Sequence, residues 1–422
     1  MLRFACAPTA DLTLDELRVA LMNFVVSIQR EERFVIRIED IDQQRNIEGK
    51  DAELVALLEL FGVIGEEVLY QSKNFKFHSA MAIDLLHRKK AFNCFCSEKE
   101  LDAKEAAAKE QKRLYSYDGT CERLPAEEII DNPKPFTVRI KKPDSDIVFK
   151  DKIQGKLSFT PDEVDSFIIL NVDKTPTRTF ATAVDDMLSD ISVVIESEEK
   201  VEEAPRHIHV RKSLGYDKEI EYAHLPPLLD AGVEIKMLLE EGFLPEAIAN
   251  YLLTVGSEMQ GDVFRLEEAK ERFDLEKIEK NAVKFDKEKL RLLNRAHLKL
   301  LDDKELSRYV GFADAEVGRL AKLFIDEIGT TKELKKRIQL IFDKKEFSSQ
   351  LQKSAETLKE LVAEAPYFDE YEVFREYLIQ KSTLPKEETE EVLYLYLNAQ
   401  ENGPQIEHLY ECLKNYIKEV VV

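Results

Sequence analysis

The feature that most constrains the fold is an alternation of apolar runs and periodic segments at the start of the chain. Residues 3–7 and 34–39 are apolar runs of strand length, and helical periodicity follows each of them, over residues 14–30 and about 49–61. Buried strands are typically short and apolar, whereas helices that cover a sheet carry apolar residues every three to four positions. The order strand, helix, strand, helix predicts a parallel sheet of the nucleotide-binding type.

The remaining chain predicts further domains, because 422 residues are too many for a single core. The pattern is irregular between about 75 and 176, strand and helix signals resume from 184 to 216, and helical periodicity dominates from about 238 onward. We therefore predict an α/β plus all-α protein, in which a Rossmann-like parallel-sheet domain is split by an insertion and followed by helical bundles. The expected boundaries are 1–75 and 177–238 for the two Rossmann-like halves, 76–176 for the insertion, and 239–315 and 316–422 for the helical domains.

The charge of the chain limits its partners. It has 61 basic and 83 acidic residues, which gives a formal charge of −22. Nucleic-acid binders gain affinity by releasing counterions from phosphates, so DNA binding and non-specific RNA binding are not expected, although a local basic patch can still hold RNA. No apolar run approaches the roughly 20 residues that a membrane span needs, and we expect a cytoplasmic protein without membrane contact.

Several short stretches occur in an order and spacing shared with one enzyme family. They are Arg3-Phe-Ala5, Arg37-Ile-Glu-Asp-Ile-Asp42, Tyr70-Gln-Ser72, Val164-Asp-Ser-Phe167, Pro176-Thr177, Val184-Asp-Asp186, Pro205-Arg-His-Ile-His209, His224-Leu-Pro226 and Glu240-Glu-Gly-Phe-Leu-Pro-Glu-Ala247. On these residues the chain resembles the class I glutamyl-tRNA synthetases, over about residues 1–300. The resemblance implies an acceptor-stem-binding insertion, a helical junction and a helical anticodon-binding domain. It also implies ATP-dependent activation of glutamate and transfer to tRNA.

The first signature of that family is a His-Ile-Gly-His-like tetrapeptide at the start of the first helix. Its histidine donates to ATP phosphates, its glycine allows close backbone approach, and the helix N-terminus adds free N–H groups. The matching residues here are Thr13, Leu14, Asp15 and Glu16, which offer two carboxylates in place of those donors. Thr13-x-x-Glu16 fits a capping box, so we expect the helix to satisfy its own N–H groups, which argues against ATP binding.

The second signature is a Lys-Met-Ser-Lys-Ser-like loop, expected between Pro226 and Glu240. The connection is shorter than the family's, and Lys236 is its only basic residue. The surrounding Ile-Lys-Met-Leu-Leu predicts a helix instead of a mobile loop. Removal of one transition-state donor typically costs about 3–4 kcal/mol, so the loss of both elements predicts undetectable adenylation.

The amino-acid pocket is altered as well. By resemblance its positions are Arg3, Ala5, Glu39, Arg178, Glu196 and Lys200. Glu196 replaces an arginine of the family, which inverts the charge that would face a substrate carboxylate. We expect Arg178 and Glu196 to form a salt bridge that closes the pocket; the alternative is a new pocket for another ligand, such as one bearing an amine.

Four residues of the insertion match the optional zinc site of the family. They are Cys94, Cys96, Tyr117 and Cys121. An odd cysteine count with a Cys-x-Cys pair indicates reduced thiols, and four such ligands would close a tetrahedral structural zinc site. Buried reduced cysteines without metal are the alternative.

Three functional hypotheses remain open at this point. The first is a non-catalytic protein of this family that binds tRNA or a translation-related protein. The second is an active glutamate–tRNA ligase with an atypical site. The third is a small-molecule sensor that uses the altered amino-acid pocket.

Overall fold

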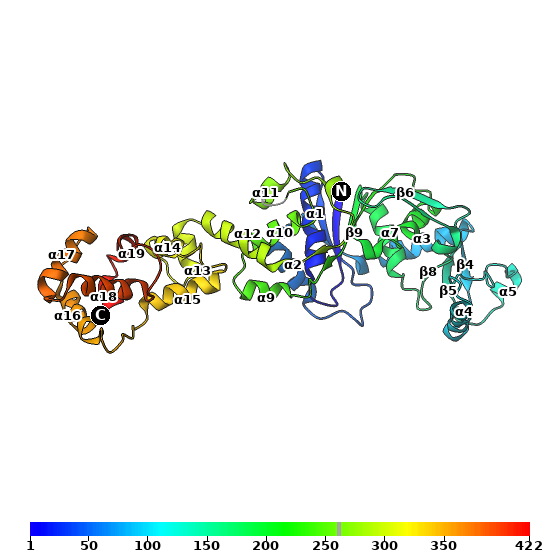
Figure 1. Ribbon diagram of the computed structural model, residues 1–422. Coiled ribbons are helices and arrows are strands. Elements are labelled where there is room, and N and C mark those ends of the chain that lie inside the picture. The colour runs from blue at the N-terminus through cyan, green and yellow to red at the C-terminus, as the bar shows by residue number, and fades with distance from the viewer. Residues whose placement is uncertain (260–262) are drawn as a thin grey trace. The chain divides into compact units, whose positions relative to one another are not determined.

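The computed structural model describes residues 1–259 and 263–422, which form two compact units (Figure 1). The first unit comprises Met1–Gly232 and Leu252–Phe285, and the second comprises Val233–Tyr251 and Asp286–Val422. Among the described residues, no helix is long and apolar enough to cross a membrane.

Parallel strands form the core of the first unit. They are β1 (Leu2–Cys6), β2 (Phe34–Ile38), β3 (Glu67–Tyr70), β9 (Val193–Ser197) and β10 (Glu221–Leu225). β1 pairs with β2 and β2 with β3, and β9 pairs with β10, in each case in parallel. The Ser192 N–H donates to the Met1 carbonyl (3.0 Å), which joins the beginnings of β9 and β1. The predicted parallel sheet is confirmed.

Helix α1 (Leu14–Arg30) covers this sheet and spans the residues that its periodicity predicts. Most of its apolar residues are buried, Leu17 and Leu21 completely, whereas Asp15 and Glu16 lie in its first turn. The buried Asn23 amide donates to the carbonyl of Ile195 (3.0 Å), which fixes α1 to β9. Figure 1 shows α1 lying along β1 and β9. Polar contacts from one helix thus reach strands that are far apart in sequence.

The range predicted to be an insertion contains a small antiparallel sheet and a hairpin. The sheet consists of β4 (Ala91–Cys94), β5 (Thr137–Ile140) and β8 (Ile168–Leu170), in the order β4-β5-β8. The hairpin consists of β6 (Ile147–Asp151) and β7 (Gly155–Phe159), and β6 pairs in parallel with β10. The hairpin therefore extends the larger sheet, although its residues lie within 76–176.

Helices and short elements complete the first unit. They are α2 (Lys50–Leu60), α3 (Phe75–His87), α4 (Glu98–Glu110), α5 (Ala126–Ile130), α6 (Pro161–Val164), α7 (Arg178–Leu188), α8 (Ala204–Ser213), α11 (Leu266–Ala269), the strands β11 (Leu228–Leu229) and β12 (Val283–Lys284), and the 3-10 turns η1 (Gln71–Asn74), η2 (Glu198–Lys200) and η3 (Leu275–Lys277). Helix α7 matters most for the site, because it carries the two buried carboxylates Asp185 and Asp186.

The second unit is helical, as the sequence predicts, and its described residues contain no strand. Its helices are α9 (Ile235–Glu240), α10 (Pro245–Thr254, whose last residues count with the first unit), α12 (Lys287–Leu300), α13 (Asp303–Tyr309), α14 (Ala315–Lys322), α15 (Thr331–Phe342), α16 (Gln352–Glu364), α17 (Tyr371–Ser382), α18 (Lys386–Asn398), α19 (Ile406–Leu413) and α20 (Ile417–Val421). Buried Leu320, Phe324 and Leu334 belong to its apolar core. Gly242 has a φ of 92°, and a Cβ there would lie 2.5 Å from the Lys332 nitrogen, so this close approach requires glycine.

Candidate functional site

The N-terminus of α1 is closed by its own side chains. The Thr13 hydroxyl oxygen accepts from the Glu16 N–H (3.1 Å), and the Glu16 carboxylate accepts from the Thr13 N–H (2.9 Å) and the Thr13 hydroxyl (3.0 Å). The predicted capping box is confirmed. Free N–H groups at the start of a helix can bind an anion. Here the Glu16 carboxylate of the chain already accepts a hydrogen bond from one of the N–H groups at this end, that of Thr13.

The Asp15 carboxylate also accepts a hydrogen bond within the chain, from a residue that follows β10. The donor is the Leu228 N–H (2.9 Å). Burial raises the pKa of Asp15, and the Leu228 hydrogen bond and the Arg18 charge only partly oppose this effect. The buried Arg18 guanidinium donates to the Pro226 carbonyl (2.9 Å). Residues 226–228, which follow β10, are therefore held against the first turns of α1.

A cavity of about 440 Å³ opens beside this helix end. The carboxylates that line it are Asp15, Glu16, Glu196 and Glu199, and the cations that line it are Arg3 and Lys200. Carboxylates thus outnumber cations. Such a lining opposes the entry of phosphate groups, because like charges repel each other strongly in a cavity with low-dielectric walls.

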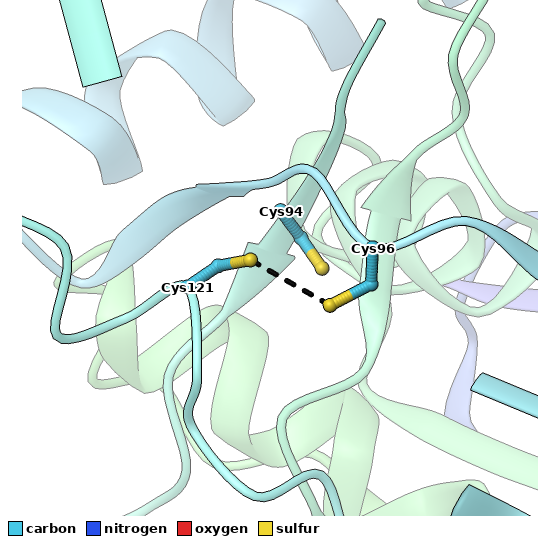
Figure 2. A group of neighbouring side chains, drawn as sticks. All are labelled: Cys94, Cys96 and Cys121. Atoms are coloured by element: carbon cyan, nitrogen blue, oxygen red, sulfur yellow. Dashed lines mark hydrogen bonds between the residues drawn. The ribbon is translucent and has the colours of Figure 1, made fainter. Parts of the chain in front are cut away.

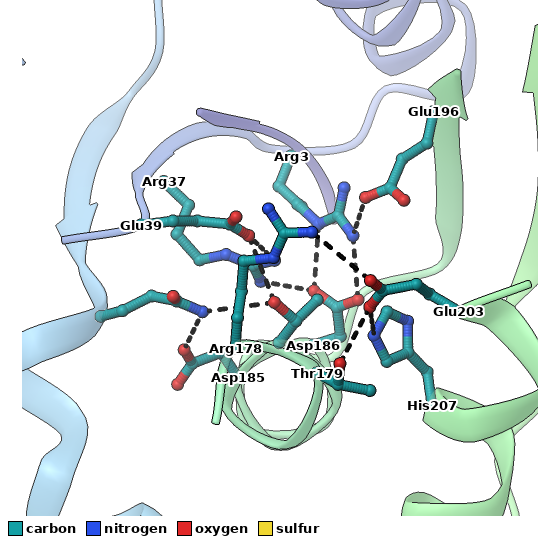
Figure 3. Close-up of polar contacts among 12 residues, drawn as sticks. Arg3, Arg37, Glu39, Arg178, Thr179, Asp185, Asp186, Glu196, Glu203 and His207 are labelled. Atoms are coloured by element: carbon teal, nitrogen blue, oxygen red, sulfur yellow. Dashed lines mark hydrogen bonds and ion pairs between the residues drawn. The ribbon is translucent and has the colours of Figure 1, made fainter. Parts of the chain in front are cut away.

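Arg3 is the centre of a buried charge cluster at the end of this cavity (Figure 3). Its Nε and Nη2 donate to the two oxygens of Asp186 (3.0 and 3.1 Å), and Nη2 also lies 2.8 Å from Glu196 Oε1. Arg37 binds the same Asp186 and lies 3.3 Å from the Glu39 carboxylate. Sequence reasoning missed Arg37, although it lies in a stretch that carries the family resemblance.

The charges in this cluster hold one another ionised despite burial. Burial acts against ionisation of Glu196, but Arg3 and then Lys200 lower its pKa to about 2. Burial likewise opposes charge on Asp186, but Arg3 and Arg37 keep its pKa well below the ordinary value. The pKa of Arg3 is raised, since Asp186 and Glu196 outweigh its burial. Arg3 is thereby neutralised by side chains of the protein.

The predicted salt bridge between Arg178 and Glu196 is wrong. Arg178 is exposed and lies 3.4 Å from Glu203, while Glu196 pairs with Arg3. Glu203 also accepts from the Thr179 hydroxyl (3.1 Å) and lies 3.7 Å from the His207 ring. Glu196 pairs with Arg3 because a buried guanidinium must be compensated by charged partners, whereas water can solvate the exposed Arg178.

The structure divides the predicted pocket residues between two cavities. Arg3, Ala5, Glu196 and Lys200 line the cavity beside α1, together with Thr13, Asp15 and Glu16 from the predicted signature positions. Glu39 and Arg178 instead line a separate cavity of about 890 Å³. The N-terminal Leu14 of α1 is buried in the core and lines neither.

Three cysteines converge within residues 94–121 (Figure 2), and a tyrosine lies beside them. The sulfurs of Cys94, Cys96 and Cys121 lie within 4.8 Å of one another, and the Cys96–Cys121 distance is 3.6 Å. The Tyr117 oxygen is 3.5 Å from the Cys94 and Cys96 sulfurs. Four sulfurs around zinc would be about 3.8 Å apart for a bond length of about 2.3 Å, so this arrangement fits a tetrahedral ion.

The donors of this cluster differ in how readily they lose a proton. Burial disfavours the thiolate of Cys94, but the Tyr117 hydroxyl and Arg139 contribute to a lowered pKa for this residue. Burial and the neighbouring cysteines instead raise the pKa of Cys96 to about 11, and burial raises the pKa of Tyr117. A thiolate is the form that binds metal. Three thiols and a phenol that close on one point leave no open coordination position, so the role of a bound ion would be structural. Cys6 and Cys412 do not belong to this cluster.

Comparisons with known proteins agree with the fold. Residues 1–292 match the family model described as tRNA synthetases class I (E and Q), catalytic domain. The chain is 50% identical to glutamate–tRNA ligase 2 of Sulfurimonas denitrificans and 46% identical to glutamate–tRNA ligase 1 of Nitratiruptor sp., over 431 residues in each case. Both alignments cover 100% of this chain and 100% of the relative.

A solved structure has the same architecture over nearly the whole chain. It is the crystal structure of a glutamate tRNA ligase from Elizabethkingia meningosepticum in complex with its amino acid. The two share a TM-score of 0.82 and 23% sequence identity, over 99% of this chain and 97% of the other. Together with the family match, these comparisons show that the chain belongs to the class I glutamyl-tRNA synthetase family.

Proposed function

We propose that this chain binds tRNA as a member of the glutamyl-tRNA synthetase family and does not activate glutamate with ATP. Full-length similarity to glutamate–tRNA ligases supports the tRNA half of the proposal. The closed N-terminus of α1, where Thr13 and Glu16 cap each other, is the single observation that carries the other half.

The charges at the start of α1 oppose ATP binding. A triphosphate would need free N–H donors and cations at the start of α1, because those groups offset its negative charge. Glu16 is engaged in the cap, and Asp15 is held by the Leu228 N–H. Since removal of one transition-state donor typically costs about 3–4 kcal/mol, a site with carboxylates in place of donors would be slower by far more than 1,000-fold.

The region after β10 supports the same proposal. From Pro226 to Glu240 the only basic residue is Lys236, and it lies within helix α9. A loop that follows the phosphates during catalysis needs mobile cations. A lysine in a regular helix is a poor replacement for such a loop.

The glutamate half of the reaction is affected by Arg3. A guanidinium recognises a substrate carboxylate through its free N–H groups. Asp186 and Glu196 already take the Nε and Nη2 donors of Arg3, at distances of 2.8 to 3.1 Å. A substrate carboxylate would have to displace a buried ion pair, so we expect glutamate to bind poorly.

An active glutamate–tRNA ligase is the second candidate. Identity of 50% over the full length to a protein of that name favours it. Both candidates bind tRNA, and they differ in whether adenylate forms. Formation of adenylate therefore separates them.

The decisive experiment is glutamate-dependent exchange of pyrophosphate into ATP, measured with and without tRNA, alongside calorimetric titration of ATP. We expect exchange at background and no ATP binding, together with a tRNA shift in electrophoresis. Glutamate-dependent exchange clearly above background would establish the active ligase instead. Failure to shift tRNA would reject the tRNA half of the proposal.

A restoring variant makes the test sharper. Thr13→His/Asp15→Gly/Glu16→His removes both carboxylates and the cap, and we expect it to gain ATP binding without gaining exchange. The matched control is Thr160→His/Glu163→His, because Thr160 and Glu163 form a second exposed capping box at α6, outside the cavity. ATP binding that fails to appear in the first variant would show that the cap is not what closes the site.

A further inference from the structure

A basic groove lies in the first unit on the β6–β7 hairpin and the C-terminal half of α8. Its volume is about 680 Å³. Six cations line it, against the three acidic residues Asp217, Glu219 and Glu221; the cations are Lys150, Lys152, Lys156, Arg211, Lys212 and Lys218. This excess is opposite in sign to the charge of the chain, which is −22. The lining shares no residue with the cavity beside α1 or with the cavity that contains Glu39.

Only some of these cations are neutralised by the protein. Lys152 pairs with Glu221 (3.1 Å), and Lys218 pairs with Asp190 (2.6 Å). Within the described ranges 1–259 and 263–422, the exposed Lys150, Lys156 and Lys212 have no carboxylate at ion-pair distance. Three unpaired ammonium groups around one hollow create a positive potential that attracts anions.

Arg211 is the most informative of the six. Its side chain is only 4% exposed, and its Nη2 donates to the Tyr222 hydroxyl (2.6 Å). Its Nη1 has no hydrogen-bond partner among the described residues, nor does a carboxylate there pair with the guanidinium. Buried charges are normally paired, because an unpaired one loses its hydration without compensation. A buried guanidinium without a carboxylate partner, beside a groove lined by cations, favours the binding of an anion from outside the chain.

Apolar and aromatic side chains also line the groove. They are Val148, Phe149, Ile208, Tyr216 and Ile220, and the Tyr216 hydroxyl donates to Asp190 (3.0 Å), which leaves its ring as the contact surface. We propose that the basic groove binds a nucleoside phosphate, whose phosphates contact Arg211 and the unpaired lysines and whose flat base contacts the apolar lining. Cavities of about 300 to 1,000 Å³ are typical of small-molecule sites. This site is independent of glutamate activation.

The test is calorimetric titration of the full chain with GTP and, separately, with inorganic tripolyphosphate. GTP replaces ATP so that the cavity beside α1 plays no part. We expect GTP to bind more tightly than tripolyphosphate, with an affinity that falls as salt rises. The variant Lys150→Glu/Lys156→Glu/Lys212→Glu should weaken GTP binding by about 100-fold or more. The charge-matched control, Lys99→Glu/Lys109→Glu/Lys353→Glu, changes three exposed lysines outside the groove and should bind GTP like the original chain.

Arg211→Lys tests the buried guanidinium, since it keeps the charge and removes the forked donors. We expect GTP binding to weaken by about tenfold while the unfolding temperature changes little. No GTP binding, or equal binding by the triple variant and its control, would overturn the proposal. Equal affinity for tripolyphosphate and GTP would reject the nucleoside contact. Binding of an RNA oligonucleotide without binding of GTP would reject the small-molecule site.

Discussion

The cysteine cluster within residues 94–121 and the N-terminus of α1 are both positions where this family implies a ligand, and they differ in how their polar groups are paired. In the cluster, the sulfurs of Cys94, Cys96 and Cys121 lie within 4.8 Å of one another (Figure 2), and the Tyr117 oxygen lies 3.5 Å from two of them. At the end of α1, Thr13 and Glu16 bond to each other and to the helix backbone. The first region gathers metal-binding side chains around one point, whereas the second pairs the Thr13 and Glu16 N–H groups with side chains of the same helix end.

The two regions of one fold thus differ in whether their polar groups are paired within the chain. Helix α1 begins at Leu14, directly after its N-cap residue Thr13. The carboxylates of the cap supply the negative charge that the helix dipole favours. A nucleotide would therefore gain little from this helix end, while a metal would gain four ligands at the cluster.

The largest effect is expected at the cluster. We predict that the purified chain contains about one zinc ion per molecule, and that Cys94→Ser/Cys121→Ser contains almost none. Since a structural zinc contributes on the order of 10 kcal/mol to folding, the inserted range of this variant should become sensitive to protease. Elemental analysis and limited proteolysis measure both effects. Cys412→Ser, which changes a cysteine outside the cluster, is the control. If the unaltered protein contains no metal and is nevertheless stable, the prediction of a structural zinc ion is wrong.

The next effect concerns the cluster that neutralises Arg3. Asp186→Asn should lower the free energy of unfolding by about 3–5 kcal/mol, because Arg3 and Arg37 would keep buried charges with too few partners. Urea denaturation followed by circular dichroism measures this loss. The control Asp190→Asn alters an exposed carboxylate that pairs with Lys218 and should change little. A small effect of Asp186→Asn would mean that Arg3 remains available to a substrate.

Acid should weaken the same region in two stages. Burial lowers the pKa of His207 to about 4, so the unfolded chain binds the extra proton first and stability falls as pH decreases from 6.5 towards 4. The pKa of Glu196 is about 2 in the folded chain against 4.5 when unperturbed, so its contribution of about 3 kcal/mol is present above pH 4.5 and is lost between pH 4.5 and 2. Urea denaturation across this pH range should show a shallower acid limb for Glu196→Gln. The exposed Glu199→Gln should follow the original chain, and an unchanged limb in Glu196→Gln would refute the pairing with Arg3.

The smallest effect is expected at the cap itself. Thr13→Ala should cost about 1 kcal/mol of stability, as the loss of a capping side chain usually does. Ser97→Ala removes the corresponding residue from the capping box of α4 and provides the comparison. Thermal unfolding of both variants measures the costs. A much larger cost at Thr13 than at Ser97 would show that Thr13 does more than cap a helix.

Local patterns explain which features the sequence predicts well. The span of α1 follows from the spacing of its apolar residues, and its capping box follows from Thr13 and Glu16, which are three residues apart. The helix around Lys236 follows from its apolar neighbours. Such features depend on residues that are close in the chain, so periodicity and capping rules are sufficient to identify them.

Long-range pairing explains what the sequence does not predict. From the sequence alone, Arg178 is a plausible partner for Glu196. The structure pairs Glu196 with Arg3 instead, because Arg3 is buried beside it whereas Arg178 is exposed. The pairing of β6 with β10 depends on the path of a hairpin that starts in the inserted range. The unpaired Arg211 is visible only once the surroundings of α8 are known. No local pattern reports these facts, since each involves residues brought together by tertiary structure.

The ion pair between Arg3 and Asp186 also has a consequence for synthesis. The two residues are separated by 183 positions, and Glu196 is added later still. At roughly 5–20 residues per second, a ribosome takes roughly 10–40 seconds to supply these partners after Arg3 has been made. During that interval strand β1 carries an unpaired cation and cannot enter a dry interior. The first strand of the sheet must therefore be among the last to settle, and a chaperone that shields nascent chains would meet it exposed.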